Sequence, residues 1–197
     1  MIKLILTKII FIFLFSVYST KFIYAVEITL NGNYANSYTS SYQYTKITYG
    51  LDISIPLGNY FEFNFGETIS DEQYTYNDEY KNYLISKGNT LPAGKLTQSY
   101  KSTDNYGNLS LGIFSYNISP SIYGGIVDRD SYFKDYYGQE TNDYGYITWN
   151  AGAALSIHVG RHFAIKVTYR ISPSGVNSPS GTTYYDQSYT GGLTLRF

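Results

Sequence analysis

Two histidines are the side chains of this chain best suited to catalysis. His158 follows Ser156 at a spacing of two, so both side chains lie on one face of an extended strand. A Ser–His pair could carry out acyl transfer, and His162 lies just beyond the next turn. The sequence has no cysteine, and it contains no P-loop, dinucleotide fingerprint or G-x-S-x-G motif. Asp128 and Asp130 could hold a hard cation, but two carboxylates alone are more commonly solvated. We therefore interpret the histidines as polar filler and turn residues, and expect no catalytic residue, cofactor or metal.

The elements that position these residues are strands, because apolar and polar residues alternate with a period of two nearly everywhere. The alternating segments number eight, and lie at residues 27–38, 44–57, 61–66, 106–114, 121–130, 147–158, 163–171 and 184–197. The facing of segment 121–130 stays open, because Ile122 and Ile126 share one side whereas Tyr123 and Val127 share the other. Connections of a few residues alternate with long polar ones, chiefly 67–105 and 130–143. Short turns that alternate with long loops are typical of an outer-membrane barrel.

The N-terminus has the pattern of a secretory signal peptide. Lys3 and Lys8 precede an apolar run too short to span a bilayer, and a small residue follows at Ala25. An uncleaved N-terminal anchor is the alternative. We expect residues 1–25 to be the signal peptide and residues 26–197 to form one barrel domain. That domain carries a net charge of −4, because three of the 14 basic residues precede it and all 15 acidic ones remain. Such a balance argues against a nucleic-acid partner.

Charged residues in the middle of the strands decide which face of the sheet is inside. A soluble sandwich could not bury them unpaired, whereas a small barrel can pair them with one another in its interior. Eight strands leave an interior that side chains fill, so we expect a plugged lumen with a polar network. The predicted network comprises Glu27, Lys46, Asp52, Glu62, Lys166, Arg170, Asp186 and Arg196. If the barrel closes, Glu27 and Arg196 are neighbours. The predicted fold is all-β, an eight-stranded antiparallel up-and-down transmembrane β-barrel.

The last nine residues, YTGGLTLRF, support this prediction. Their alternating apolar positions end on an aromatic residue: Tyr189, Leu193, Leu195 and Phe197. This ending resembles the C-terminal signal of Gram-negative outer-membrane barrels, and the whole chain resembles the small OmpA-type and OmpX-type barrels. The resemblance implies a location in the cell outer membrane, contact with its lipid and lipopolysaccharide, recognition by the barrel-insertion machinery, and a monomer.

Any binding function is expected to lie in the long loops, which are rich in tyrosine. Tyrosine gives a large contact area at low entropic cost. The candidate residues for binding a host or other surface ligand are Tyr74, Tyr76, Tyr80, Tyr83, Tyr132, Tyr136 and Tyr137. The predicted function is that of a structural, surface-exposed barrel with adhesive or partner-binding loops. The alternatives are a narrow pore, a lipid A-modifying enzyme, and a soluble lipocalin-like barrel with its apolar face inward.

Overall fold

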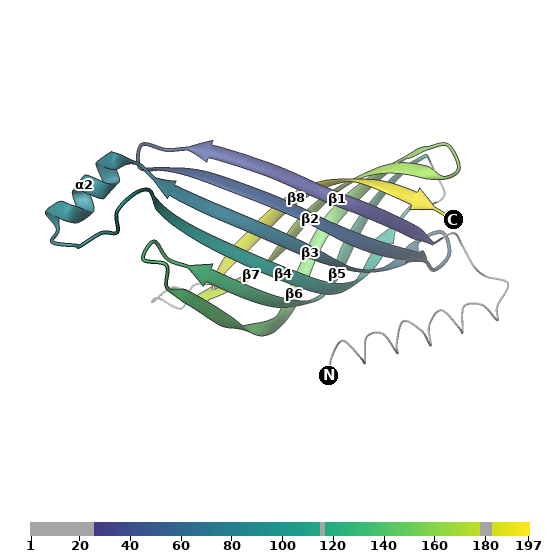
Figure 1. Ribbon diagram of the computed structural model, residues 1–197. Helices are drawn as coiled ribbons and strands as arrows, with labels where there is room; N and C mark the ends of the chain where they lie inside the picture. The colour runs from purple at the N-terminus through teal and green to yellow at the C-terminus, as the bar shows by residue number, and fades with distance from the viewer. Residues whose placement is uncertain (1–25, 115–116, 178–182) are drawn as a thin grey trace.

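The computed structural model describes residues 26–114, 117–177 and 183–197, so the expected signal peptide lies outside the described residues. Within these ranges, eight strands pair antiparallel in chain order and close into a barrel, which Figure 1 shows as a long cylinder with the short helix α2 at one end. The strands are β1 (Glu27–Tyr38), β2 (Tyr42–Pro56), β3 (Phe61–Tyr76), β4 (Leu96–Gly112), β5 (Ile118–Lys134), β6 (Glu140–Val159), β7 (Phe163–Asn177) and β8 (Thr183–Arg196), and the helix is α2 (Asp78–Ser86).

Closure is made by β1 and β8. Glu27 lies opposite Arg196, Ile28 opposite Leu195, and the ladder continues to Gly32. The backbone N–H of Phe197 donates to the carbonyl of Val26. Because both edges of the sheet are used, the barrel presents no unpaired edge strand along this seam.

The barrel has an apolar exterior and a polar interior. Leu193 is 68% exposed, whereas Lys166 on the adjacent strand β7 is 9% exposed. On β7 the outward positions run from Phe163 to Ile171, which spans about 20 Å along the barrel axis at ~3.3 Å per residue and a tilt of ~40°. That height is close to the ~25 Å apolar band of outer-membrane barrels. The polarity rules out a lipocalin-like barrel, which would bury these apolar side chains.

Aromatic side chains mark the two borders of the apolar belt. Tyr169 and Tyr189 pack 4.9 Å apart on the outer surface, and Trp149 and Tyr185 pack 5.9 Å apart toward the end that carries α2. Exposed Phe61, Phe163 and Phe197 lie at the opposite end. Aromatic girdles of this kind sit at the membrane–water interfaces. Among the described residues, no helix is long and apolar enough to span a bilayer.

The two ends of the barrel differ in their connections. At one end, which we call the short-turn end, β2–β3 and β6–β7 are joined by tight turns in which Gly58 and Gly160 have positive φ angles of 94° and 82°. At the other, which we call the hairpin end, β3 and β4 rise to the helical segment, and β5 and β6 rise to a turn at residues 135–139. Figure 1 shows α2 projecting from this end, far from the C-terminus.

The expected loop over 67–105 is wrong for most of its length. β3 continues to Tyr76, β4 begins at Leu96, and the two strands pair along the whole hairpin. Tyr74 and Tyr76 therefore lie on a strand, as does Tyr132 on β5. The alternation fades there because both faces of the hairpin are polar, whereas tyrosine and threonine still favour strands.

Between these strands the chain forms helix α2, which the sequence analysis did not anticipate. The side chain of Asn77 accepts a hydrogen bond from the Tyr80 N–H, and Asp78 and Glu79 occupy the first turn. An N-cap asparagine followed by acidic residues is a recognisable helix start. None of the helix residues is buried.

The structure also settles the facing of β5. Ile122 and Ile126 lie outside and are exposed, whereas Val127 is buried. Tyr123 points inward and donates its hydroxyl hydrogen to the Tyr169 carbonyl, 3.0 Å away. A register irregularity between Arg129 and Ser131 is consistent with a bulge in this strand.

Candidate functional site: the ionic interior and the tyrosine surface

The interior of the barrel is organised around Asp104, which is 3% exposed. Arg129 donates to both of its carboxylate oxygens, from Nε at 2.7 Å and from Nη2 at 2.9 Å. Arg170 donates to the same carboxylate from the opposite wall at 3.0 Å. Arg129 also contacts Asp186 and donates to the Ser172 hydroxyl. These groups, which we call the Asp104 hub, join strands β4, β5, β7 and β8 across the lumen.

A second ionic layer lies at the short-turn end. Arg196 donates from Nη2 and Nε to Glu27 at 2.6 and 2.8 Å, across the closing seam of the barrel. Lys166 lies 3.7 Å from Glu62 and 3.4 Å from the Ser54 hydroxyl. Because both carboxylates are buried, loss of a partner would leave a charge in a medium that solvates it poorly.

A third layer lies toward the hairpin end, where Lys46 and Glu72 face each other in register at 2.6 Å.

Each of the eight residues expected in the polar network lies on a strand. Seven of them form ion pairs: Glu27, Lys46, Glu62, Lys166, Arg170, Asp186 and Arg196. Asp52 instead accepts a hydrogen bond from Asn31 at 2.5 Å.

Sequence reasoning missed three residues of the network: Glu72, Asp104 and Arg129. The first two lie in the stretch expected to be a loop. No apolar–polar alternation marks Asp104, because Ser102, Thr103, Asp104 and Asn105 are all polar, although Ser102 and Asp104 are buried in the interior.

The histidines lie away from the hairpin end. His158 Nε2 is 3.2 Å from the Ser119 hydroxyl. Ser156, two residues before His158, lies opposite Ser119 in the β5–β6 register. His162 Nδ1 lies 3.2 Å from the Arg196 carbonyl in the exposed turn. The described residues place no carboxylate in hydrogen-bond contact with either imidazole. An acyl-transfer site also needs a group that orients the base, so this geometry gives it little support.

At the hairpin end, six tyrosines form one continuous chain of ring contacts, which we call the tyrosine surface. Successive ring centroids lie 4.8 to 6.2 Å apart, in the order Tyr44, Tyr74, Tyr42, Tyr76, Tyr80 and Tyr83. Its first four members lie on the inward face of β2 and β3, the face that carries Lys46 and Glu72, at the mouth of the lumen. From there the chain continues to helix α2, where Lys87 lies over the Tyr83 ring at 5.7 Å. It unites four of the candidate residues, Tyr74, Tyr76, Tyr80 and Tyr83, with two that were missed.

The remaining candidates belong to the β5–β6 hairpin. Tyr136 and Tyr137 pack 4.5 Å apart at its tip, where Asp135 accepts hydrogen bonds from the Tyr137 and Gln139 N–H groups. Below the tip, hydrogen bonds from Tyr132 and Lys134 lower the pKa of Glu140. The tip of this hairpin therefore carries a second, smaller aromatic patch, and the strand ends next to it carry polar and charged side chains.

Comparison with solved structures places this geometry among known folds. The alignment with the crystal structure of Neisserial surface protein A covers 88% of this chain and 95% of that chain, with a TM-score of 0.50 and 8% sequence identity. The alignment with the N-terminal β-barrel domain of Pseudomonas aeruginosa OprF covers 88% of this chain and 97% of that domain, with a TM-score of 0.50 and 14% sequence identity. The chain has the fold of the small outer-membrane β-barrels. No family model and no curated protein matches the sequence.

The fold and its polarity together locate the chain. An apolar belt bounded by aromatic girdles, wrapped around an ionic interior, is the arrangement of a β-barrel in the outer membrane. The resemblance to OmpA-type and OmpX-type barrels is thus confirmed at the level of the fold, and the outer-membrane location agrees with it.

Proposed function

We propose that this protein is a closed outer-membrane barrel that presents the tyrosine surface to an external partner. The single observation that carries the proposal is the chain of five ring contacts among six tyrosines that ends on a helix with no buried residue. Long hairpins face the cell exterior in outer-membrane barrels, so the hairpin end is assigned to the outside and the short-turn end to the periplasm.

Helix α2 supports a binding role because its apolar side chains contribute nothing to a core. Tyr83 and Ile85 are both more than half exposed. An exposed helix of nine residues is marginal alone, so its side chains gain most from contact with a partner. Tyrosine rings give such contacts with few rotatable bonds to immobilise.

The ionic interior supports a closed barrel over a narrow pore. The Asp104 hub connects four strands across the lumen, and the Glu62–Lys166 pair crosses it nearer the periplasm. A permeating ion would have to displace buried pairs at both levels, which is costly. We expect no steady single-channel conductance from the purified protein in planar bilayers. Steady channels would refute the closed barrel without bearing on the tyrosine surface.

The binding role is tested by adherence of Gram-negative cells that express the protein to cultured epithelial cells and to immobilised matrix proteins. Replacing Tyr80 and Tyr83 with alanine should reduce adherence to that of cells without the protein, while the barrel still folds because neither side chain is buried. Tyr60→Ala is the matched control, since it removes an exposed tyrosine at the short-turn end. Undiminished adherence of the double variant, or equal loss in the control, would refute the role.

We also propose that residues 1–25 are removed as a signal peptide and that the domain of residues 26–197 is inserted by the barrel-insertion machinery through its C-terminal residues. N-terminal sequencing of the protein from outer membranes should begin at Val26. Replacing Phe197 with serine should reduce the amount that reaches the outer membrane and increase the unfolded periplasmic fraction. An N-terminus at Met1 or unchanged assembly would overturn the respective proposal.

A further inference from the structure

The charges in the barrel interior do not balance. Taking His158 as neutral, five basic side chains face six carboxylates in the described interior: Lys46, Arg129, Lys166, Arg170 and Arg196 against Glu27, Asp52, Glu62, Glu72, Asp104 and Asp186. Every basic group is already in an ion pair with a carboxylate other than Asp52. Within the part of the chain that the structure describes, Asp52 has no ion pair shorter than 4.0 Å.

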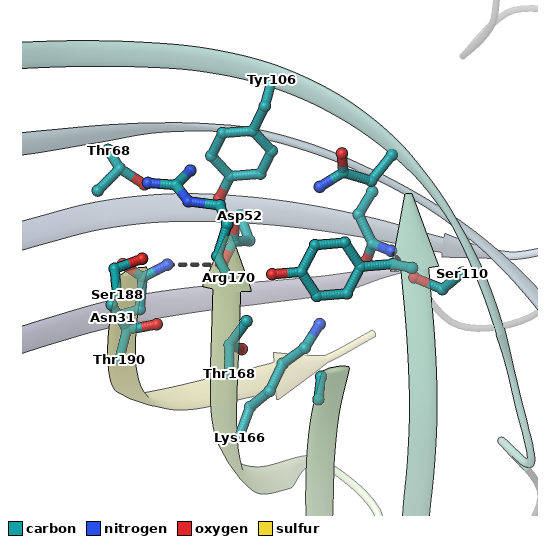
Figure 2. A pocket seen from close by; sticks show the side chains of 14 residues that line it. Asn31, Asp52, Thr68, Tyr106, Ser110, Lys166, Thr168, Arg170, Ser188 and Thr190 are labelled. Atoms are coloured by element: carbon teal, nitrogen blue, oxygen red, sulfur yellow. Dashed lines mark hydrogen bonds between the residues drawn. The ribbon is translucent and has the colours of Figure 1, made fainter. Parts of the chain in front are cut away.

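The unpaired carboxylate faces a cavity. A space of about 40 Å³ lies inside the barrel between the Asp104 hub and the Glu62–Lys166 pair, and Asp52, Asn31 and Asn108 are among the side chains that line it. In Figure 2 a dashed line joins Asn31 to Asp52, Arg170 overlaps Asp52 in this view, and Thr168 and Lys166 follow on the same strand as Arg170. A water molecule needs about 10–15 Å³ by the same measure, so the cavity has room for about three water-sized species.

The cavity lining also contains hydrogen-bond acceptors that lack a donor. The side-chain oxygens of Asn31 and Asn108 are buried without a partner, and Asn108 is 4% exposed. Inward glycines make room for them, because a Cβ at Gly50 would lie 2.8 Å from the Asn31 oxygen and one at Gly125 would lie 2.4 Å from the Asn108 oxygen. Buried acceptors in this state are costly, so they point to an occupant that either donates hydrogen bonds or carries positive charge.

We propose that the cavity binds one monovalent cation of the size of Na⁺ or K⁺, held by the Asp52 carboxylate, the amide oxygens of Asn31 and Asn108, and water. One positive charge balances the unpaired carboxylate, and oxygen ligands suit an alkali cation. Water alone would satisfy the amides, but the buried carboxylate would then have to take up a proton or rely on Lys166 and Arg170, which are already paired elsewhere. A divalent ion is disfavoured because the cavity holds one free carboxylate and is also lined by Lys166 and Arg170. An anion would face two unpartnered amide oxygens and the Asp52 carboxylate.

The test is thermal unfolding of the folded barrel in detergent, with NaCl replaced by N-methylglucamine chloride at equal ionic strength. That cation is too large for the cavity. Because a ligand that binds only the folded state stabilises it by mass action, we expect the melting temperature in NaCl to be higher by about 3 °C. The Asp52→Asn variant keeps the side-chain shape and should lose the difference. Asp71→Asn, which removes an exposed carboxylate that pairs with Lys101, should retain it.

A second measurement does not depend on a variant that folds. Crystals of the unaltered protein soaked in thallium(I) acetate should give an anomalous peak within coordination distance of the Asp52 carboxylate. The proposal is overturned if unfolding is insensitive to cation size, if Asp52→Asn keeps the sensitivity, or if the cavity gives no anomalous peak and holds water only.

Discussion

The substitution Asp104→Ala measures how strongly the ionic interior stabilises the barrel. It removes the carboxylate that accepts from Arg129 at 2.7 and 2.9 Å and from Arg170 at 3.0 Å, and so leaves two guanidinium groups short of a partner. Breaking a buried ion pair by removing one member costs about 3–5 kcal/mol. Arg129 retains Asp186 and Ser172, so we place the expected loss of unfolding free energy toward the lower end, at about 3 kcal/mol.

Asp71→Ala is the matched control on the same hairpin. Asp71 pairs with Lys101 at 3.2 Å, but the two side chains are 44% and 58% exposed, so its loss should cost at most about 1 kcal/mol. The assay is urea unfolding in lipid vesicles, followed by the gel shift between folded and heat-denatured forms. Equal losses for Asp104→Ala and Asp71→Ala would refute the reasoning that burial makes the hub strong. In the double variant Asp104→Leu with Arg129→Met, only part of the loss should be recovered, because the Arg129 charge is no longer buried whereas Arg170 and Asp186 each still lack the partner that they had.

Three further predictions concern the exterior and the close contacts between strands. Leu193→Lys places a charge in the apolar belt and should cost about 2–4 kcal/mol in the urea assay, whereas Tyr83→Lys on α2 should change stability by less than about 0.5 kcal/mol. Gly66→Ala should cost about 1–3 kcal/mol, because its Cβ would lie 2.3 Å from a backbone oxygen of β2, whereas Gly191→Ala meets open space and should be nearly neutral. Trp149, the single tryptophan, should show blue-shifted emission in vesicles and be quenched by brominated lipid; an unquenched signal would contradict its place in the girdle.

Much of the fold can be predicted from the sequence because the outer face of the sheet meets lipid and carries apolar side chains, whereas the inner face lines the interior and carries polar ones. The period of two therefore survives wherever a strand crosses the membrane, as on β7 from Phe163 to Ile171. The same physical cause explains where prediction was wrong. Above the membrane both faces of the β3–β4 hairpin meet polar surroundings, so residues 67–76 and 96–105 lose the pattern although they stay in register.

Part of the ionic network can be predicted from the sequence and part cannot. Pairs between register neighbours follow from strand order alone, as for Glu27 and Arg196, which the sequence analysis placed side by side and which lie 2.6 Å apart. Pairs across the lumen, such as Asp104 with Arg170, could not be predicted. They depend on the tilt and stagger of the closed barrel, which no single strand encodes.

The proposed binding role separates stability and recognition along the axis of this barrel. The hub and the Glu62–Lys166 pair lie within the strands, where each partner is fixed by the opposite wall, so substitutions there act on folding. Helix α2 has no buried residue and is connected to the barrel wall by the tyrosine contacts, so its side chains can change without loss of the barrel. A chimaera that carries residues 77–95 on another small barrel should therefore bind the same partner as the parent protein. If the transplanted segment fails to bind although the host barrel folds, the wall tyrosines Tyr42, Tyr44 and Tyr74 must be part of the binding site.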